Sequence, residues 1–539
     1  MNHLTFISCT RLQNTFSNSI HGFVKMLQDL PDDILLLIFG YLSTFEIFKN
    51  VALICKNCYR VSRDYSFIQD LQLLDLSRIT ANAERYFEFL EVLRYQSKNL
   101  ANLTFHGIAS NKIIQNCLNI ASNACPKLRY LDLSYSMKYE HLKTTDPQDE
   151  DIFAMILNFK KLEYFYFDYH ESISSIGNVI FNEDSFAIFL SEHKKVLKCL
   201  HYPLPSKSLH WLTMTEELED LGIEGSSLDH SSAISLTELK KLKRLEVWNL
   251  LQRDREMFRI IALGCPQLES LVIRYLEPGQ LMAIREMYNL RKLHITCRAG
   301  FSENNCEFAL VFANKKQLTD LKLCCNCCRF DNDIQCINED CIRSIALECS
   351  NLESLTLYSR NKHSVVKVGP LGKLNHLKNL ELDMNIDVME EEVPFSFHNV
   401  CLFDEKIFNM KDLTRLDLTS AQNVTDRMLK TIALKCPKLT YLNLSLKRSE
   451  YDISNDGINQ VITKCTHLDV LKFKNMKSIT EDCLHELNQG NLPKLKLLHL
   501  FGCLKIATKY LEKLALFRKT LEILTPDGQE FNARHIEKL

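Results

Sequence analysis

The run CCNCC at residues 324–328 holds the densest group of reactive side chains in this sequence. Two of its thiol pairs, Cys324 with Cys327 and Cys325 with Cys328, have the two-residue gap that zinc ligands favour. A packing role is also compatible with the run, because its first two cysteines directly follow an alternating leucine pattern that predicts a buried strand. No histidine pair completes a usual zinc motif. We therefore expect packed thiols, with no metal and no cofactor, and zinc is the alternative that elemental analysis would reveal.

Motifs for catalysis are missing from the sequence. Its 17 histidines are scattered and form no His-Glu-x-x-His motif. It also has no Gly-x-Ser-x-Gly nucleophile elbow and no phosphate-binding loop ending in Gly-Lys-Ser/Thr. We therefore expect that the protein is not an enzyme.

The composition limits the partners and the compartment. The formal net charge of -2 argues against coating nucleic acid or a membrane surface, since both roles favour an excess of basic residues. No run of 18 apolar residues occurs, so we expect no membrane span. With 21 cysteines and no secretory leader pattern, we expect reduced thiols and a cytoplasmic or nuclear location.

A second group of side chains has the chemistry for binding another protein. Aromatic rings and guanidinium groups contribute most of the free energy at protein interfaces. Six of them lie at or beside the polar positions of short leucine-containing segments, and we expect them to bind a target protein: Arg244, Trp248, Arg274, Tyr358, Arg415 and Tyr441. The charges along these positions are mixed, which indicates neither an acidic nor a basic target.

The segments that carry these six residues share one phrase, L-x-x-L-x-L, as in CPKLTYLNL at 436–444. The first leucine of the phrase recurs from Leu100 to Leu521 at a mean spacing of about 28 residues. Within the phrase, Leu442 and Leu444 alternate with polar neighbours, which predicts a strand with one buried face.

The residues between two phrases predict a helix. In NVTDRMLKTIALKC, Thr425 suits the N-cap and Asp426 the positive end of a helix, and the apolar residues that follow have helical spacing. Neither element can bury its apolar face alone, so each unit must stack on the next. The sequence therefore predicts an α/β fold, a curved solenoid with a parallel sheet on its concave wall and helices outside.

Five cysteines lie three residues before a first leucine, where a helix is predicted to end and a small apolar residue fits: Cys125, Cys265, Cys349, Cys436 and Cys465. With the phrase and its period, this pattern resembles the cysteine-containing subfamily of leucine-rich repeats. The resemblance implies a horseshoe solenoid over residues 73–539 that binds a protein on its concave face.

A strongly apolar helix is predicted near residue 30, ahead of the repeats. Pro31 suits the first helical position, and Asp32 and Asp33 suit the positive end of the helix. Seven apolar residues between 34 and 42 cover an arc of roughly 200°, about twice that of an ordinary one-sided helix. A unit of about 40 residues can hardly cover both surfaces, which predicts that a foreign protein covers one of them.

Residues 30–68 resemble an F-box. The family pattern is matched by Leu30, Pro31, Asp32, Asp33, Ile34, Leu35, Ile38, Phe39, Tyr41, Leu42, Ile54, Cys55 and Lys56. The chain departs from it at Cys58, where the family usually has tryptophan, and at Phe67-Ile68, where it has Leu-Trp. The resemblance implies docking onto a Skp-type adaptor, and through it a cullin, by Leu30, Pro31, Ile34, Leu35, Ile38, Phe39, Tyr41, Leu42, Ile54 and Cys55.

Taken together, these patterns predict three parts: a lead-in at 1–28, a small all-helical F-box at 29–72, and the solenoid at 73–539. The combination resembles the F-box and leucine-rich-repeat family of substrate receptors in ubiquitin ligases. The alternative is a protein-binding scaffold whose F-box-like helices only cap the repeats, with no ligase role. Binding of a Skp-type adaptor distinguishes the two functions.

Overall fold

The chain divides into two compact units, Met1–Gly222 and Ile223–Leu539, and each is described by itself. The structure is a computed structural model that describes residues 30–39, 54–62, 70–74, 100–106, 111–134, 152–167, 183–202, 206–224, 228–248, 255–276, 281–297, 308–325, 337–359, 366–383, 386–387, 410–419, 424–445 and 453–531. Leu37 and a few other residues in these ranges have described backbone only.

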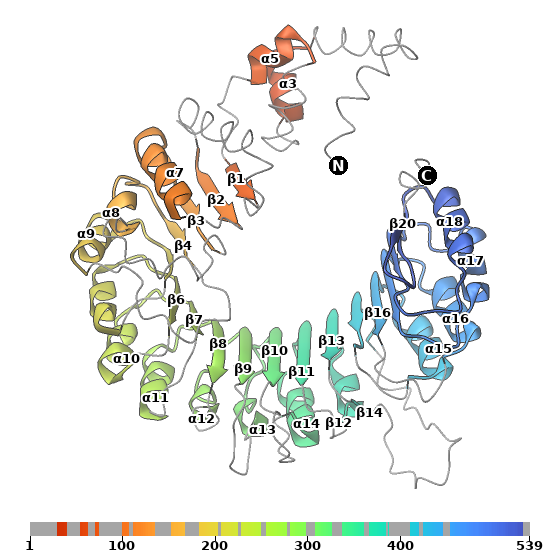
Figure 1. Cartoon of the computed structure of the whole chain (residues 1–539). Helices are drawn as coiled ribbons and strands as arrows, with labels where there is room; N and C mark the ends of the chain where they lie inside the picture. The colour runs from red at the N-terminus through yellow and green to blue at the C-terminus, as the bar shows by residue number, and fades with distance from the viewer. Residues whose placement is uncertain are drawn as a thin grey trace. The chain divides into compact units, whose positions relative to one another are not determined.

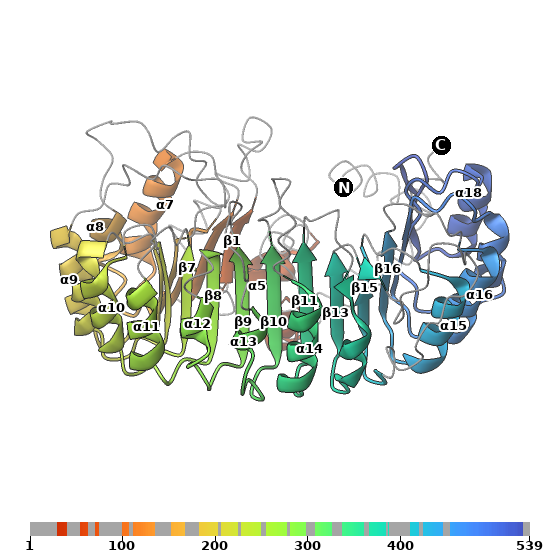
Figure 2. The same ribbon diagram turned by 90° about the horizontal axis from the view of Figure 1, so that it is seen from below.

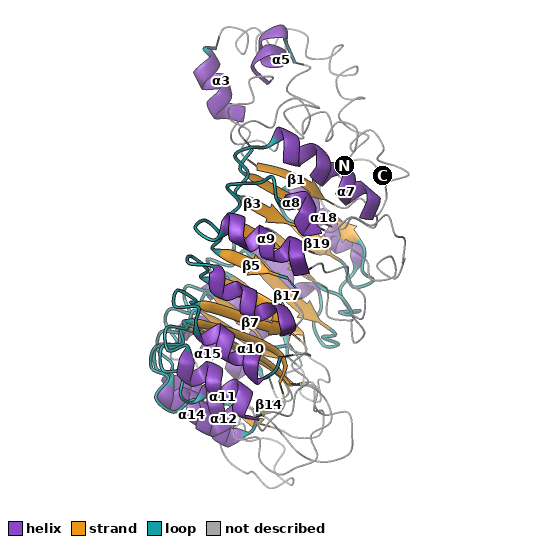
Figure 3. Cartoon of the chain, turned by 90° about the vertical axis from the view of Figure 1, so that its left-hand side faces the viewer, coloured by secondary structure: helices purple, strands orange, loops and turns teal. Residues whose placement is uncertain are grey.

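The first unit contains two short helices, α3 (Asp32–Phe39) and α5 (Lys56–Ser62), and a series of β–α repeats. Its strands pair in parallel and in chain order: β1 (Asp70–Leu74), β2 (Asn102–His106), β3 (Tyr130–Asp132), β4 (Tyr164–Tyr166), β5 (Cys199–His201) and the start of β6 (Asp220–Glu224). Figure 3 shows the connecting helices along one face of these strands: α7 (Asn111–Ala124), α8 (Ile152–Ile156) and α9 (Glu183–His193), followed by the 3-10 helix η6 (Ser206–Met214).

The second unit repeats this arrangement. Its parallel strands are β7 (Arg244–Trp248), β8 (Ser270–Leu276), β9 (Lys292–Cys297), β10 (Asp320–Cys325), β11 (Ser354–Ser359), β13 (Asn379–Asp383), β15 (Arg415–Asp417), β16 (Tyr441–Ser445), β17 (Val470–Lys474), β18 (Leu497–His499) and β19 (Glu522–Leu524). An antiparallel strand, β20 (Glu530–Phe531), follows β19, and a separate short pair is formed by β12 (Val366–Lys367) and β14 (Ile386–Asp387).

The helices of the second unit lie on one face of its sheet, as Figures 1 and 2 show for α11 to α14. They are α10 (His230–Thr237), α11 (Arg255–Gly264), α12 (Leu281–Ile284), α13 (Phe308–Val311), α14 (Glu339–Glu348), η8 (Gly369–Lys373), α15 (Asp426–Lys435), α16 (Asn455–Lys464), η9 (Glu481–Leu484), α17 (His485–Asn488) and α18 (Thr508–Phe517). None of the described helices combines the length and the hydropathy needed to cross a bilayer.

The leucines of successive phrases lie in register. Leu416, Leu442, Leu471 and Leu498 pair across four neighbouring strands, and all are fully buried. Successive side chains of a strand point to opposite faces of the sheet, so the residues between the leucines line the other face. We call this second face the polar face. A solenoid-like α/β fold with a long parallel sheet is therefore confirmed, whereas the horseshoe curvature stays a prediction.

The predicted helix after the phrase at 413 is also present, as α15. Thr425 is its N-cap, and its side-chain oxygen accepts a hydrogen bond from the backbone N–H of Met428 at 3.4 Å. Met428, Leu429, Ile432 and Ala433 are buried against the sheet. The sequence was sufficient to place this helix. Thr425 and Asp426 mark its start, Lys435 lies in its last turn, and the apolar residues between them have helical spacing.

The five phrase cysteines are buried, as a packing role requires. Burial raises the pKa of the Cys349, Cys436 and Cys465 thiols to about 12, so they stay protonated at neutral pH. Cys325 ends strand β10 and is buried as well. Cys324 beside it is partly buried, and the other two cysteines of the CCNCC run, Cys327 and Cys328, lie outside the described residues.

Lys315 is an unusual residue of the second unit, because its whole side chain is buried. Its Nζ donates to the backbone carbonyl of Arg285 at 2.9 Å and lies 5.3 Å from the ring centroid of Tyr288. Burial lowers the pKa of this ammonium group from its ordinary value to about 8. The cost of burying the charge is therefore present at neutral pH and disappears once the group is deprotonated.

This burial predicts a pH-dependent stability. Between about pH 8 and 10 the unfolded chain binds more protons at Lys315 than the folded chain, so the free energy of unfolding rises with pH. We expect it to rise by about 1 kcal/mol per pH unit relative to Lys315→Met. Urea denaturation at pH 8, 9 and 10 measures this, with exposed Lys316→Met as the matched control. The prediction would be contradicted if the difference in the free energy of unfolding between wild type and Lys315→Met stayed constant with pH.

Candidate partner-binding surfaces

The helices α3 and α5 form a small core of their own. Leu35 and Phe39 on α3 pack with Cys58 and Val61 on α5, and all four are buried. Cys58 thus fills the position where an F-box usually has tryptophan. Partly buried apolar residues surround this core, namely Leu30, Leu36, Ile54 and Cys55.

One flank of α3 stays exposed. Ile34 and Ile38 are 43% and 39% exposed, although both are large and apolar. With the exposed Pro31 just before the helix, they lie within about 60° of one another at 100° per residue. Tyr59 on α5 is a further exposed apolar residue. We call Pro31, Ile34 and Ile38 the helical flank.

A polar contact holds the two helices together at their surface. Arg60 of α5 forms an ion pair with Asp32 in the first turn of α3, and it also donates to Asn57 at 2.7 Å. The hydrogen bond from Arg60 holds the pKa of the Asp32 carboxyl below its usual value. The pair is exposed, so it orients the helices more than it stabilises them.

The structure distributes the predicted adaptor residues over two environments. Leu35 and Phe39 were expected on the adaptor surface, but they face the core of the helical pair, because α3 must bury one side against α5. Ile34 and Ile38 remain accessible. Tyr41 and Leu42 lie outside the described residues. Tyr59 is an exposed residue that the family pattern did not point to.

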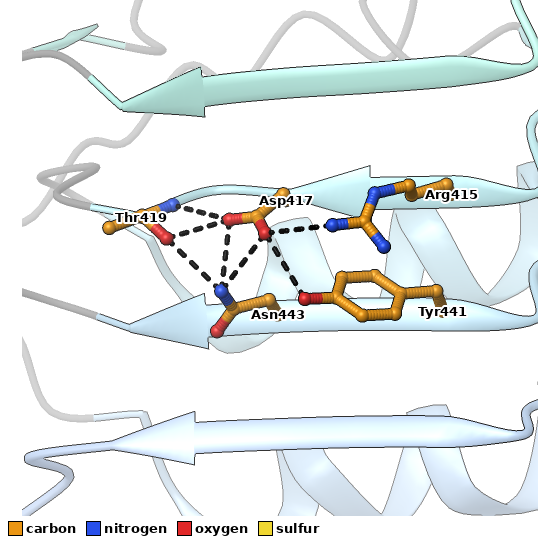
Figure 4. A network of polar contacts seen from close by, with 5 residues as sticks. All are labelled: Arg415, Asp417, Thr419, Tyr441 and Asn443. Carbon is orange, nitrogen blue, oxygen red and sulfur yellow. Dashed lines mark hydrogen bonds and ion pairs between the residues drawn. The ribbon is translucent and has the colours of Figure 1, made fainter. Parts of the chain in front are cut away.

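On the polar face of the second unit, Arg415 and Tyr441 belong to one polar network (Figure 4). At its centre is Asp417, only 5% exposed, whose carboxylate accepts two hydrogen bonds of 3.0 Å from the Asn443 amide. It also accepts from the backbone N–H and hydroxyl of Thr419, at 3.2 and 2.7 Å, and from the Tyr441 hydroxyl at 3.3 Å. The network joins strands β15 and β16 where their polar positions are in register.

The network fixes the orientation of a partly exposed guanidinium group. Arg415 lies 3.6 Å from the Asp417 carboxylate, and its guanidinium carbon is 3.5 Å from the ring centroid of Tyr441. Lys472 on β17 lies 5.4 Å from the same ring. An arginine held on an aromatic ring loses little conformational entropy when it binds, which suits a protein interface.

A second cluster on the polar face joins strands β7 and β8. Arg274 lies 2.9 Å from Oε1 of Glu246, and Trp248 donates its indole N–H to the same oxygen at 2.9 Å. Trp248 is only 8% exposed, so little of the ring that was predicted to bind a target protein is accessible. Arg244 is exposed at the start of β7, and Tyr358 is half-buried on the more distant strand β11. Four of the six predicted target residues therefore belong to two clusters, and Arg244 and Tyr358 occupy separate positions.

The comparisons with known proteins concern the N-terminal segment and the fold. A family model described as F-box-like matches residues 27–71. No curated protein matches the chain. One solved structure with some similarity is the Rad7 and Elc1 complex in yeast. The matched chain is 15% identical to this protein, the match covers 96% of this chain and 98% of the other, and the TM-score is 0.38. Another is the TLR13–ssRNA13 complex, whose matched chain is 13% identical. The match covers 88% of this chain and 81% of the other, and the TM-score is 0.36. Both similarities are too low to bear on function.

Proposed function

We propose that this protein is the substrate-recognition subunit of a Skp–cullin–F-box ubiquitin ligase. The F-box docks a Skp-type adaptor, and the leucine-rich repeats hold the target protein. The F-box-like match at residues 27–71 carries this proposal. The exposure of Ile34 and Ile38 on the matched segment supports it, because docking needs an accessible apolar surface.

The helical flank has a reason to bind a protein. Fully burying an isoleucine side chain gains roughly 1.5–3 kcal/mol, and Ile34 and Ile38 lie one helical turn apart. A single exposed hydrophobe is ordinary, but a cluster on so small a unit is better explained by a partner. Asp32 and Arg60 border this flank and supply a polar rim of the kind that interfaces have.

Target binding is assigned to the polar face of the repeats. The phrase L-x-x-L-x-L, its period and the parallel strands it forms support the assignment to leucine-rich repeats. Arg415 and Tyr441 are the strongest contact candidates, because they are aligned by their neighbours before any partner arrives. Ubiquitin transfer is then performed by other subunits, and this chain contributes binding only.

The decisive experiment is reconstitution of the full chain with a purified Skp-type adaptor. We expect a one-to-one complex by size-exclusion chromatography with light scattering, and loss of the complex when residues 29–70 are deleted. Circular dichroism checks that the deleted protein keeps its folded repeats. Undiminished adaptor binding by the deletion variant would end the proposal.

The self-contained core of Leu35, Phe39, Cys58 and Val61 favours one alternative, in which the helices only cap a binding scaffold. In that case no Skp-type adaptor binds. A ligase that contains this chain, by contrast, ubiquitinates itself or a target in a reconstituted reaction with a cullin complex. The two functions are therefore separated by adaptor binding first and by ubiquitination second.

A further inference from the structure

A thiol, an imidazole and a carboxylate meet on two neighbouring strands of the first unit. Cys199 and His201 alternate on β5, so their side chains point to the same face of the sheet. Asp220 begins β6 and pairs in register with Cys199. The parallel register therefore places Asp220 beside the two residues of β5, although it is 19 residues further along the chain than His201.

The ligand atoms of these three residues are close together. The Cys199 sulfur, an imidazole nitrogen of His201 and a carboxylate oxygen of Asp220 all lie within 4.8 Å of one another. The shortest of these separations is 2.9 Å, between Nε2 of His201 and Oδ1 of Asp220. All three groups are largely buried: Cys199 is fully enclosed, and the side chains of His201 and Asp220 are 11% and 13% exposed.

Cys199 differs from the cysteines that pack at helix ends. Those thiols lie among apolar side chains, as Cys265 does, whose sulfur donates to the backbone carbonyl of Leu236 at 3.5 Å. Cys199 instead occupies a polar-face position of its phrase, next to an imidazole and a carboxylate. A buried thiol in this environment is poorly explained as a small hydrophobe.

Sulfur, imidazole nitrogen and carboxylate oxygen are the ligands that zinc prefers. Bonds of about 2.0 Å to nitrogen and oxygen and about 2.3 Å to sulfur place tetrahedral ligand atoms roughly 3.3–3.6 Å apart. His201 and Asp220 would separate by only about 0.4 Å to reach this spacing, while Cys199 moves in by about 1.2 Å at most. We propose that Cys199, His201 and Asp220 bind one zinc ion, with the fourth position taken by water or by a side chain of a bound partner.

Two tyrosines support this arrangement from the preceding strands. The Tyr166 hydroxyl hydrogen-bonds to Cys199, and the Tyr166 ring lies 4.9 Å from the imidazole of His201. The Tyr130 ring lies 5.4 Å from that of Tyr166 at a tilt of 41°, and its hydroxyl donates to Asp132 at 3.2 Å. Such neighbours orient metal ligands and shield them from water.

Asp132 lies in register with Tyr166, two strands before His201, and its carboxylate is engaged by other groups. Its Oδ1 accepts the backbone N–H of Ser134 at 2.8 Å, and its Oδ2 accepts the Tyr130 hydroxyl. Asp220 is the carboxylate aligned with the thiol, because it lies on the strand directly paired with β5.

Zinc content of the full-length chain tests this proposal. We expect one zinc ion per chain by elemental analysis. After removal of zinc by a chelator, titration with cobalt should give the near-ultraviolet charge-transfer band of a sulfur–cobalt bond. Cys199→Ala, His201→Gln and Asp220→Asn should each weaken metal affinity at least tenfold. Cys265→Ala, which removes a buried thiol that packs at a helix end, should keep both the zinc and the cobalt band.

Two results would overturn the proposal. One is a wild-type chain that holds no zinc and gives no cobalt band. The other is zinc that remains in Cys199→Ala but is lost in Cys327→Ala, which would place the metal in the CCNCC run. If Cys199→Ala fails to fold, Asp220→Asn decides, because its amide preserves the shape of the carboxylate. Adaptor binding does not depend on these residues, so this proposal and the proposed ligase function can fail separately.

Discussion

Replacing Ile34 and Ile38 together by aspartate is expected to abolish binding of the full chain to a Skp-type adaptor. Both side chains are about two-fifths exposed on one flank of α3, so the carboxylates stay hydrated in the unbound chain. In the complex they would lose water without gaining a partner, which costs several kcal/mol. We expect at least a 100-fold loss of affinity, measured by isothermal titration with the purified adaptor.

Two further variants separate a lost surface from a lost fold. Leu347→Asp changes a leucine on α14 that is even more exposed, at 55%, and should leave adaptor affinity unchanged. Leu35→Ala creates a cavity in the helical core, costs about 2–5 kcal/mol of the stability of the helical pair, and weakens binding only through unfolding. Wild-type affinity in the double aspartate variant would show that the helical flank is not the adaptor surface.

Replacing Asp417 by alanine is expected to lower the free energy of unfolding of the second unit by about 3 kcal/mol. The carboxylate is almost fully buried and accepts hydrogen bonds from three side chains, so its removal takes a shared acceptor from all three. The Asn443 amide suffers most, because it is buried and directs two hydrogen bonds of 3.0 Å at this carboxylate. Urea denaturation followed by circular dichroism measures the loss.

The matched control for this loss is an exposed acidic residue with one partner. Asp412 forms a 2.6 Å ion pair with Lys438, and 45% of its side chain is exposed, so Asp412→Ala should cost much less stability than Asp417→Ala. Asp417→Asn keeps the shape of the side chain but loses its charge and part of its acceptor capacity. Its loss in the free energy of unfolding should therefore lie between those of Asp417→Ala and Asp412→Ala. A loss in Asp417→Ala no larger than that in Asp412→Ala would mean that the network contributes little to stability.

Much of the fold could be predicted because its information is local. The alternation of Leu442 and Leu444 identifies a one-sided strand, and Thr425 with the apolar residues after it identifies a capped helix. Each of these signals operates within about a dozen residues, and the structure confirms both. The phrase also predicts stacking, since an isolated strand and helix cannot bury their apolar faces.

The candidate sites were less predictable, because they depend on which side chains meet. The pattern around residue 30 identified a helix with two apolar surfaces, but only the packing against α5 decided that Leu35 turns inward and Ile34 outward. Trp248 was expected to bind a target protein. Its side chain is mostly buried, and its indole N–H donates to Glu246, an outcome that depends on side-chain conformation and not on strand periodicity.

The sequence by itself determined the repeating strand and helix, the buried leucines and cysteines, and the short apolar helix that resembles part of an F-box. Each follows from the spacing of apolar residues along one segment. Only the tertiary structure decided that Arg415 stacks on Tyr441, and that Asp220 lies beside Cys199. The reason is physical: spacing specifies the face on which a side chain lies, whereas its neighbours depend on the register between strands that are far apart in the chain.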